Sequence, residues 1–129
     1  MLDHISLGVS NLAQMKAFYD AILAPLGYQR LWETPVGAGY GRTRIDDDFA
    51  LFQPAEPPPM LAAGPGFHVA FTAPSRAAVD AFHAAALANG GQDEGAPGPR
   101  VAYGSGYYAA FVRAPDGHKL EAVYHAAAA

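Results

Sequence analysis

Two histidines and one glutamate have the residue types of a metal site. His4 stands near the start of the chain, His68 follows it by 64 positions, and Glu121 lies close to the other end. Neutral imidazole and ionised carboxylate are common ligands of divalent metals in proteins. Two imidazoles and one carboxylate on a common face would leave coordination positions open for a substrate. These three residues are therefore a candidate divalent-metal site.

Such a site would suit a substrate that chelates the ion through two oxygens. The reacting carbon would then lie beside a Lewis acid, which stabilises an enolate-like or oxyanionic intermediate. With iron, the same open site could activate dioxygen instead. The sequence leaves the catalytic base open among Glu121 itself, a metal-bound hydroxide and a tyrosine.

The pattern around each candidate ligand predicts a strand with one buried face. Apolar and small or polar residues alternate from Leu2 to Val9 and again from Phe67 to Thr72, which is the period of a half-buried strand. This alternation turns His4, Ser6 and His68 away from the apolar side. Glu121 has apolar neighbours on both sides, so the same rule turns it toward the histidines.

The segments that follow the two histidines repeat each other at the same spacing of 64. Asn11 and Ser75 are suited to cap helices. Phe18 and Phe82 then recur on apolar stripes with helical spacing, and Gly27 and Gly91 follow as stop signals. Because cap, aromatic residue, stop signal and histidine share one register, the chain is interpreted as an internal duplication.

Each half is predicted to continue with three strands. In the first half we expect strands at 29–34, 40–45 and 49–52, with turns at 37–39 and 46–48. In the second half we expect strands at 107–113 and 119–125, separated by the turn Pro115-Asp116-Gly117. The fold class is therefore α+β, with two βαβββ modules.

One domain of residues 1–129 is expected, with module one at 1–53 and module two at 67–125. The linker, residues 54–66, is rich in proline, alanine and glycine and contains Pro57-Pro58-Pro59, which cannot lie inside a sheet.

Composition narrows the function. The formal net charge is −4, and the 8 Lys and Arg residues form no basic run, so nucleic acid and membrane surfaces are not expected partners. No long apolar stretch and no signal peptide is apparent, and a cytoplasmic protein is expected. The absence of cysteine removes disulfides, thiolate ligands and cysteine nucleophiles.

Several residues are candidates for substrate binding. Tyr40, Tyr103, Tyr107 and Tyr108 follow glycine-rich turns and could line a pocket, or could be exposed strand residues. Ser6 could donate to a metal-bound oxygen, or could only leave room on the face that carries His4. The remaining histidines, His83, His118 and His125, are expected at the surface, although His125 shares the parity of Glu121 and could approach the candidate site.

Three segments resemble the vicinal-oxygen-chelate superfamily, which includes glyoxalase I, extradiol dioxygenases and the bleomycin- and fosfomycin-resistance proteins. Asp3-His4-Ile5-Ser6-Leu7 with Phe18-Tyr19 is similar to the opening of that family. Gly66-Phe67-His68-Val69-Ala70-Phe71 is similar to the start of its second module. Pro115-Asp116-Gly117-His118-Lys119-Leu120-Glu121 resembles its closing signature, with Ala114 where an Asp is usual. The resemblance covers nearly the whole chain.

The resemblance implies two modules whose sheets curl into an open cup. It also implies a divalent ion (Zn, Fe, Mn, Ni or Co) held by His4, His68 and Glu121. Glyoxalase I adds a glutamate on the last strand of its first module. Here that position is expected at Leu51 or Phe52, neither of which binds metal. A standard four-ligand glyoxalase I is therefore not expected, and the three-ligand families are nearer.

The expected function is a metal-dependent enzyme acting on a small oxygen-chelating substrate. It could be a lyase similar to lactoylglutathione lyase, an isomerase or a dioxygenase, with Glu121 as the catalytic candidate. The alternative is a metal-free binding protein that sequesters a drug or another ligand, as bleomycin-resistance proteins do. Metal content separates the two, because only the enzyme needs an ion.

A homodimer is expected from the geometry of the modules. A helix covers one face of each small sheet, and the other face carries too few large apolar residues to form a core. Two modules can close a cup within one chain or across two chains, and thirteen linker residues reach far enough for either. A two-fold dimer is the commonest oligomer. We therefore predict that His4 faces His68 and Glu121 of the partner subunit.

Overall fold

The computed structural model describes residues 1–43 and 47–126. The first half contains β1 (Ile5–Gly8), α1 (Leu12–Leu23), β2 (Gln29–Thr34), β3 (Gly37–Gly41) and β4 (Phe49–Phe52). The second half contains β5 (Val69–Thr72), α2 (Arg76–Ala88), β6 (Gln92–Pro99), β7 (Tyr107–Arg113) and β8 (Lys119–His125). Short 3₁₀ helices at Ala24–Leu26 and Val101–Tyr103 complete the described elements. Within these residues neither helix is long and apolar enough to cross a bilayer.

The two halves have the same strand order, which confirms the predicted repeat. The sheets run β1-β4-β3-β2 and β5-β8-β7-β6. In each, the first strand pairs in parallel with the last, and the other pairs are antiparallel. The α+β class with two βαβββ modules is therefore confirmed.

The helices begin where the sequence predicted. The side chain of Asn11 accepts a hydrogen bond from the backbone N–H of Gln14 at 3.0 Å, and that of Ser75 accepts one from Ala78 at 3.0 Å. Each bond satisfies a donor that the first helical turn would otherwise leave free, which is typically worth about 1 kcal/mol. After α1, Gly27 adopts a φ of 88°, a conformation that glycine reaches without strain.

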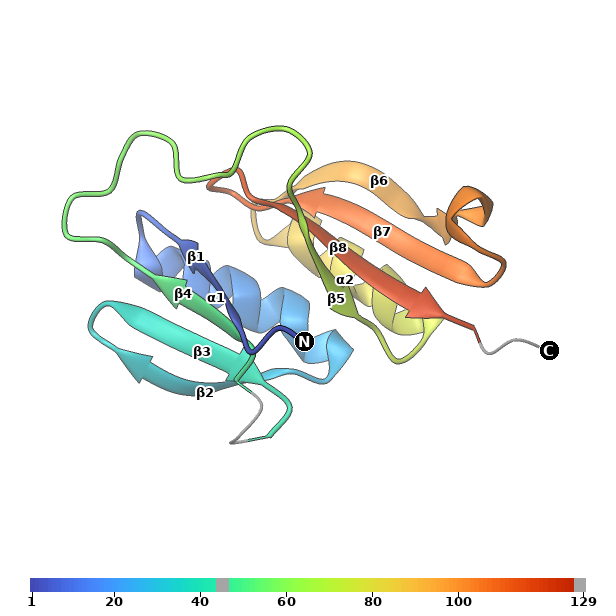
Figure 1. The fold of residues 1–129 in the computed structure, drawn as a ribbon, viewed down its shortest axis with the longest axis horizontal. Coiled ribbons are helices and arrows are strands. Elements are labelled where there is room, and N and C mark those ends of the chain that lie inside the picture. The colour runs from blue at the N-terminus through green and yellow to red at the C-terminus, as the bar shows by residue number, and fades with distance from the viewer. Residues whose placement is uncertain (44–46, 127–129) are drawn as a thin grey trace.

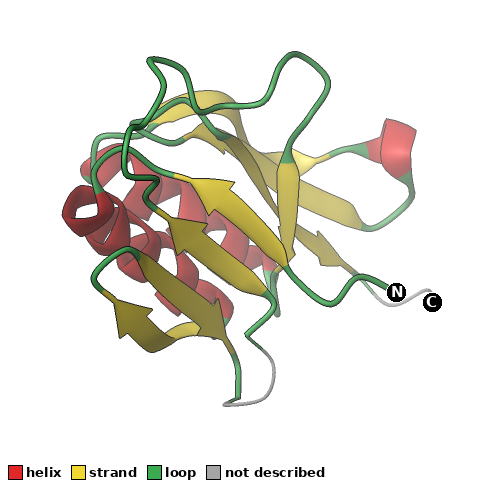
Figure 2. Cartoon of the chain, turned by 60° about the vertical axis from the view of Figure 1, so that its left-hand side comes forward, coloured by secondary structure: helices red, strands yellow, loops and turns green. Residues whose placement is uncertain are grey.

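Both helices lie on the same side of the two sheets. Figure 1 shows the sheets side by side in front of the helices, and Figure 2 shows α1 and α2 together on one side of the strands. The apolar core between these layers is continuous from one module to the other, because Phe49 of β4 meets Phe71 of β5 edge to face at 5.0 Å. No described helix covers the opposite faces of the sheets, here called the open faces.

The turn predicted at Gly37-Ala38-Gly39 was wrong, because these residues begin β3. The chain turns earlier, at Pro35 and Val36. The reason is tertiary: the indole of Trp32 packs over Gly39 on the neighbouring strand, so closely that a Cβ atom there would lie 2.0 Å from its Nε1. Of the strand expected at 40–45, residues 44 and 45 lie outside the described residues, as does the first residue of the turn expected at 46–48.

Two histidines expected at the surface are largely covered. His118 is 4% exposed, and its Nε2 lies 2.9 Å from the backbone oxygen of Gly8, so it joins the two modules. The side chain of His83 is 11% exposed and lies 2.9 Å from Asp93. His125 is exposed as expected.

Candidate functional site

Glu121 is a buried carboxylate on an open face. It belongs to β8, where its neighbours Leu120 and Ala122 are fully buried on the helix side. The alternation of the strand turns Glu121 the other way, yet its exposed fraction is only 2%. A buried charge is costly unless hydrogen bonds satisfy it, so the partners of this side chain define the site.

The partners of Glu121 come from the two segments beside β8. His68, just before β5, places its Nε2 2.8 Å from Oε1 of Glu121, and the hydroxyl of Tyr107 on β7 donates to Oε2. The register explains this convergence, because Ala70 of β5 and Phe111 of β7 both pair with Glu121 and face the same way. Burial, together with the hydrogen bond to Glu121, raises the pKa of Tyr107 to about 12. Tyr107 is therefore a protonated donor at neutral pH.

A hollow of about 510 Å³ lies in front of this cluster. Tyr103 borders it with an exposed fraction of 66%, and its ring meets that of Tyr107 at 5.4 Å. Phe111 forms part of the lining beside His68, at 5.7 Å between ring centroids. The complete lining is His68, Glu94, Arg100, Tyr103, Tyr107, Phe111, Lys119 and Glu121.

His4 lies apart from His68 and Glu121 in the single chain. Its Nδ1 is 2.6 Å from the carboxylate of Asp3, and its side chain is 55% exposed. It borders a second hollow of about 730 Å³ on the open face of module one, together with Ser6 and Trp32. Among the described residues, no group of three His, Asp or Glu side chains is arranged to hold a metal ion. One chain thus brings together two of the three candidate ligands.

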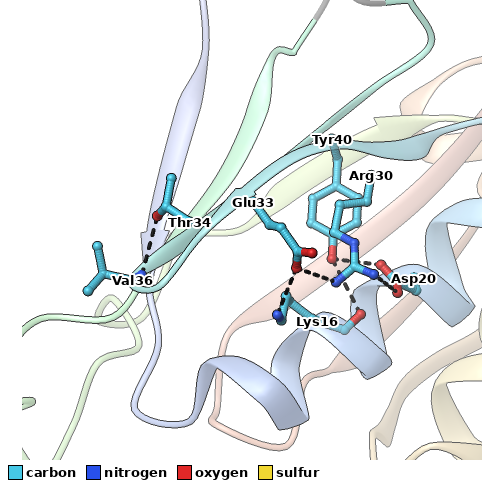
Figure 3. Close-up of polar contacts among 7 residues, drawn as sticks. All are labelled: Lys16, Asp20, Arg30, Glu33, Thr34, Val36 and Tyr40. Atoms are coloured by element: carbon cyan, nitrogen blue, oxygen red, sulfur yellow. Dashed lines mark hydrogen bonds and ion pairs between the residues drawn. The ribbon is translucent and has the colours of Figure 1, made fainter.

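Two of the candidate tyrosines have partners on the helix side. Tyr40 is 1% exposed and donates to Asp20 at 2.9 Å, within a polar cluster that ties β2 and β3 to α1 (Figure 3). It also borders a small hollow of about 210 Å³ near His4, between the modules. Tyr108 donates to Asp80 of α2 at 2.7 Å. Neither tyrosine borders the hollow of Glu121, because strand alternation turns them toward the helices.

The strand register corrects the position expected for a fourth ligand. Ala70 pairs with Glu121 in module two, and the equivalent residue of module one, Ser6, pairs with Ala50. The counterpart of Glu121 is therefore Ala50, and not Leu51 or Phe52 as the sequence suggested. The methyl group of alanine has no donor atom, so the argument against a four-ligand site is unchanged.

Sequence reasoning missed two cations beside the cluster. Lys119 shares the parity of Glu121 on β8, and this is the signal that could have placed it on the open face. Arg100 follows the irregular strand β6, whose register with β7 shifts twice. No periodicity could therefore have indicated the direction of its side chain.

Comparison with known proteins agrees with the fold. The family model of the glyoxalase/bleomycin resistance protein/dioxygenase superfamily matches residues 1–122. The crystal structure of a glyoxalase/bleomycin resistance protein from Albidiferax ferrireducens is 35% identical, with a TM-score of 0.83, and the match covers 98% of this chain and 99% of that one. No curated protein sequence matches the chain.

Two more distant structures share the fold alone. A glyoxalase I mutant from Zea mays is 22% identical with a TM-score of 0.74, covering 95% of this chain and 45% of that one. A genomically encoded fosfomycin resistance protein from Listeria monocytogenes is 19% identical with a TM-score of 0.69, covering 98% and 93%. The residues matched by the family model include His4, His68 and Glu121. The chain therefore belongs to the glyoxalase/bleomycin resistance protein/dioxygenase superfamily.

Proposed function

We propose that this protein is a cytoplasmic, metal-dependent enzyme that acts on a small oxygen-chelating substrate. The observation that carries the proposal is the carboxylate of Glu121, which is 2% exposed, lies 2.8 Å from the imidazole of His68 and borders a hollow of about 510 Å³. A buried carboxylate held against an imidazole has the donor chemistry of a divalent-metal site. Lyase, isomerase and dioxygenase reactions are all compatible with this set of donors.

The proposed ligands are His4, His68 and Glu121. The donor set fits Zn, Fe, Mn, Ni or Co, since all of these accept imidazole nitrogen and carboxylate oxygen. Two of the donors are adjacent in one chain, and the third stands on the open face of the other module. A bound ion of this kind supplies a Lewis acid that polarises the substrate oxygens. Ala50 leaves this set without a second carboxylate.

The protein groups around Glu121 have separate roles. Tyr107 donates to Oε2 of Glu121, which fixes the carboxylate and leaves Oε1 facing His68. Its raised pKa keeps the phenol protonated, so this group orients by hydrogen bonding. Tyr103 borders the same hollow and could bind the substrate, and Ser6 stands near His4 in the other hollow. Glu121 is the catalytic candidate.

A homodimer would complete the site. The open face of module one carries His4 with Trp32 at 39% and Phe52 at 51% exposure, which is apolar surface that a partner or substrate can bury. Antiparallel pairing of two chains would bring His4 of one to His68 and Glu121 of the partner subunit. This arrangement accounts for a candidate ligand set that is split between two hollows in one chain.

Elemental analysis of the purified protein after dialysis against divalent ions tests the proposal. We expect one ion for each ligand set in the wild type, and at least about a tenfold loss of affinity in His4→Ala, His68→Ala and Glu121→Gln. His83→Ala is the matched control, because this imidazole also lies 2.9 Å from a carboxylate but on the helix side. A wild type that retains no ion from any of the five metals would overturn the proposal.

The second candidate is a metal-free, bleomycin-resistance-like binding protein. The observation in its favour is the separation of His4 from the His68–Glu121 pair among the described residues, together with exposed aromatic side chains on the open face. The same dialysis separates the two candidates. A sequestering protein would keep its ligand affinity when the histidines are replaced, because no ion takes part.

A further inference from the structure

The hollow of Glu121 contains two cations that have no acidic partner in the described part of the chain. Arg100 and Lys119 both border it, and among the described residues neither forms an ion pair with a carboxylate. The other acid of the hollow, Glu94, is engaged by Arg113 at 2.5 Å. Glu121 is held by His68 and Tyr107. Neither carboxylate of the hollow therefore pairs with Arg100 or Lys119.

The guanidinium of Arg100 is held in a fixed place. It donates to the backbone oxygens of Ala96 at 2.7 Å and Gly98 at 2.9 Å. A Cβ atom on Gly95 would lie 3.2 Å from its Nη2, and one on Gly98 would lie 3.4 Å from its Nη1. The guanidinium thus occupies space that these glycines leave open. A guanidinium has five N–H donors, so the two backbone bonds leave donors for a ligand.

Lys119 lies close to the same aromatic ring as Arg100. Its ammonium is 5.4 Å from the ring centre of Phe111, and the guanidinium of Arg100 is 5.7 Å from that centre. Lys119 is also two residues from Glu121 on the same face of β8. Both cations therefore lie around one apolar ring, next to the carboxylate that we propose as a metal ligand.

We propose that Arg100 and Lys119 bind an anionic group of the substrate, so that the substrate is a small organic acid. The shared chemistry is an oxyanion, either a carboxylate or a phosphate-like group, which a guanidinium and an ammonium bind through charge-assisted hydrogen bonds. The acid group would lie over Phe111 and direct the rest of the molecule toward Glu121. The orientation toward Glu121 rests on the proposed function, whereas the anion site itself does not.

A purely structural role for Arg100 makes a different prediction. If the guanidinium only braces the irregular strand β6, its replacement lowers stability without changing anion binding in the protein that remains folded. Lys119 separates the two roles, because its side chain donates no hydrogen bond to any described residue, so its replacement should leave the fold unchanged.

The test is a titration of the metal-free protein with inorganic phosphate and, separately, with acetate at constant ionic strength, followed by amide NMR. We expect saturable chemical-shift changes at the amides of Gly95, Gly98 and Lys119 with at least one of the two anions. The anion that binds more tightly identifies the acid group of the substrate as phosphate-like or as a carboxylate. Lys119→Gln and Arg100→Gln should each weaken binding by about tenfold, as the loss of one charge-assisted bond predicts. Arg100→Lys should retain part of the affinity.

Arg76→Gln is the matched control, because that guanidinium lies 5.1 Å from the ring centre of Tyr108 on the helix side. It should bind both anions as the wild type does. No saturable response to either anion in the wild type, or an equal loss in Arg76→Gln and Lys119→Gln, would overturn the anion site. Because the titration contains no metal, its failure would leave the metal proposal standing, and a failure of metal binding would leave the anion site standing.

Discussion

At the scale of single residues, the chemistry of this chain depends on the burial of one carboxylate. Glu121 has the lowest exposed fraction of the buried polar and charged residues in the described part of the chain, and its two oxygens have different partners. A buried acceptor that loses its donor retains the cost of desolvation without compensation. The hydroxyl of Tyr107 should therefore contribute more to stability than a hydroxyl that bonds to an exposed carboxylate.

Tyr107→Phe tests this point. We expect the free energy of unfolding to fall by about 1–3 kcal/mol, because Oε2 of Glu121 stays buried without its donor. Tyr108→Phe is the control: it removes a hydroxyl bonded at 2.7 Å to Asp80, an exposed acid that water can solvate, and should cost less. Urea denaturation measures both variants. Equal losses would show that burial of Glu121 adds nothing to this bond.

At the scale of elements, the β2–β3 hairpin shows how the packing of one side chain, Trp32, affects where strand β3 begins. The indole of Trp32 covers Gly39, and its Nε1 donates to Asp47 at 2.8 Å. The glycine-rich segment reads as a turn when only local preference is considered. It forms a strand because the indole occupies the space in which a Cβ atom would stand.

Gly39→Ala should displace this indole. The new Cβ would lie 2.0 Å from Nε1 of Trp32, so the ring must leave its position, and we expect a loss of about 1–3 kcal/mol in the free energy of unfolding. Trp32 is the only tryptophan of the chain, so its fluorescence should shift to the red as the ring becomes more exposed. Gly64→Ala, with no atom within 4 Å of the added Cβ, is the control. An unchanged emission spectrum in Gly39→Ala would contradict this packing.

At the scale of the whole molecule, the question is whether His4 works with its own chain or with a partner. In the proposed dimer, each ligand set combines His4 of one subunit with His68 and Glu121 of the other. Two inactive variants then complement each other. A mixed dimer of His4→Ala and Glu121→Gln chains contains one set in which all three ligands are intact.

Mixing equal amounts of these variants, with unfolding and refolding to exchange subunits, should restore about one intact site for every two dimers, because about half of the dimers are mixed and each mixed dimer contains one intact set. The number of restored sites is measured as the metal content of the protein after free ions are removed. Each variant refolded alone is the control. Sedimentation at micromolar concentration should show a dimer in every sample. A monomer that holds an ion would show that all ligands of a set lie in one chain. A mixture that binds no ion, while the wild type does, would contradict a ligand set shared between two subunits.

The local features were predictable from the sequence. Helix caps at Asn11 and Ser75 depend on neighbouring residues, and the repeat appears as a fixed spacing between similar residues. The strand bounds 107–113 and 119–125 followed from alternation and a turn motif. Parity also placed His68 and Glu121 on one face, because successive side chains of a strand alternate wherever the strand lies.

Only the tertiary structure determined the contacts between residues that are far apart in the sequence. Register alone identified Ala50, and not Leu51 or Phe52, as the counterpart of Glu121, because pairing between strands is fixed by packing of the whole sheet. His118 contacts Gly8, and the guanidinium of Arg100 packs against the glycines of β6. Both contacts join residues that are brought together only by the packing of the chain, so hydrophobic periodicity in the sequence could not predict them. The sequence by itself thus determined the modules and their candidate ligands, whereas only the packed chain divided those ligands between two hollows.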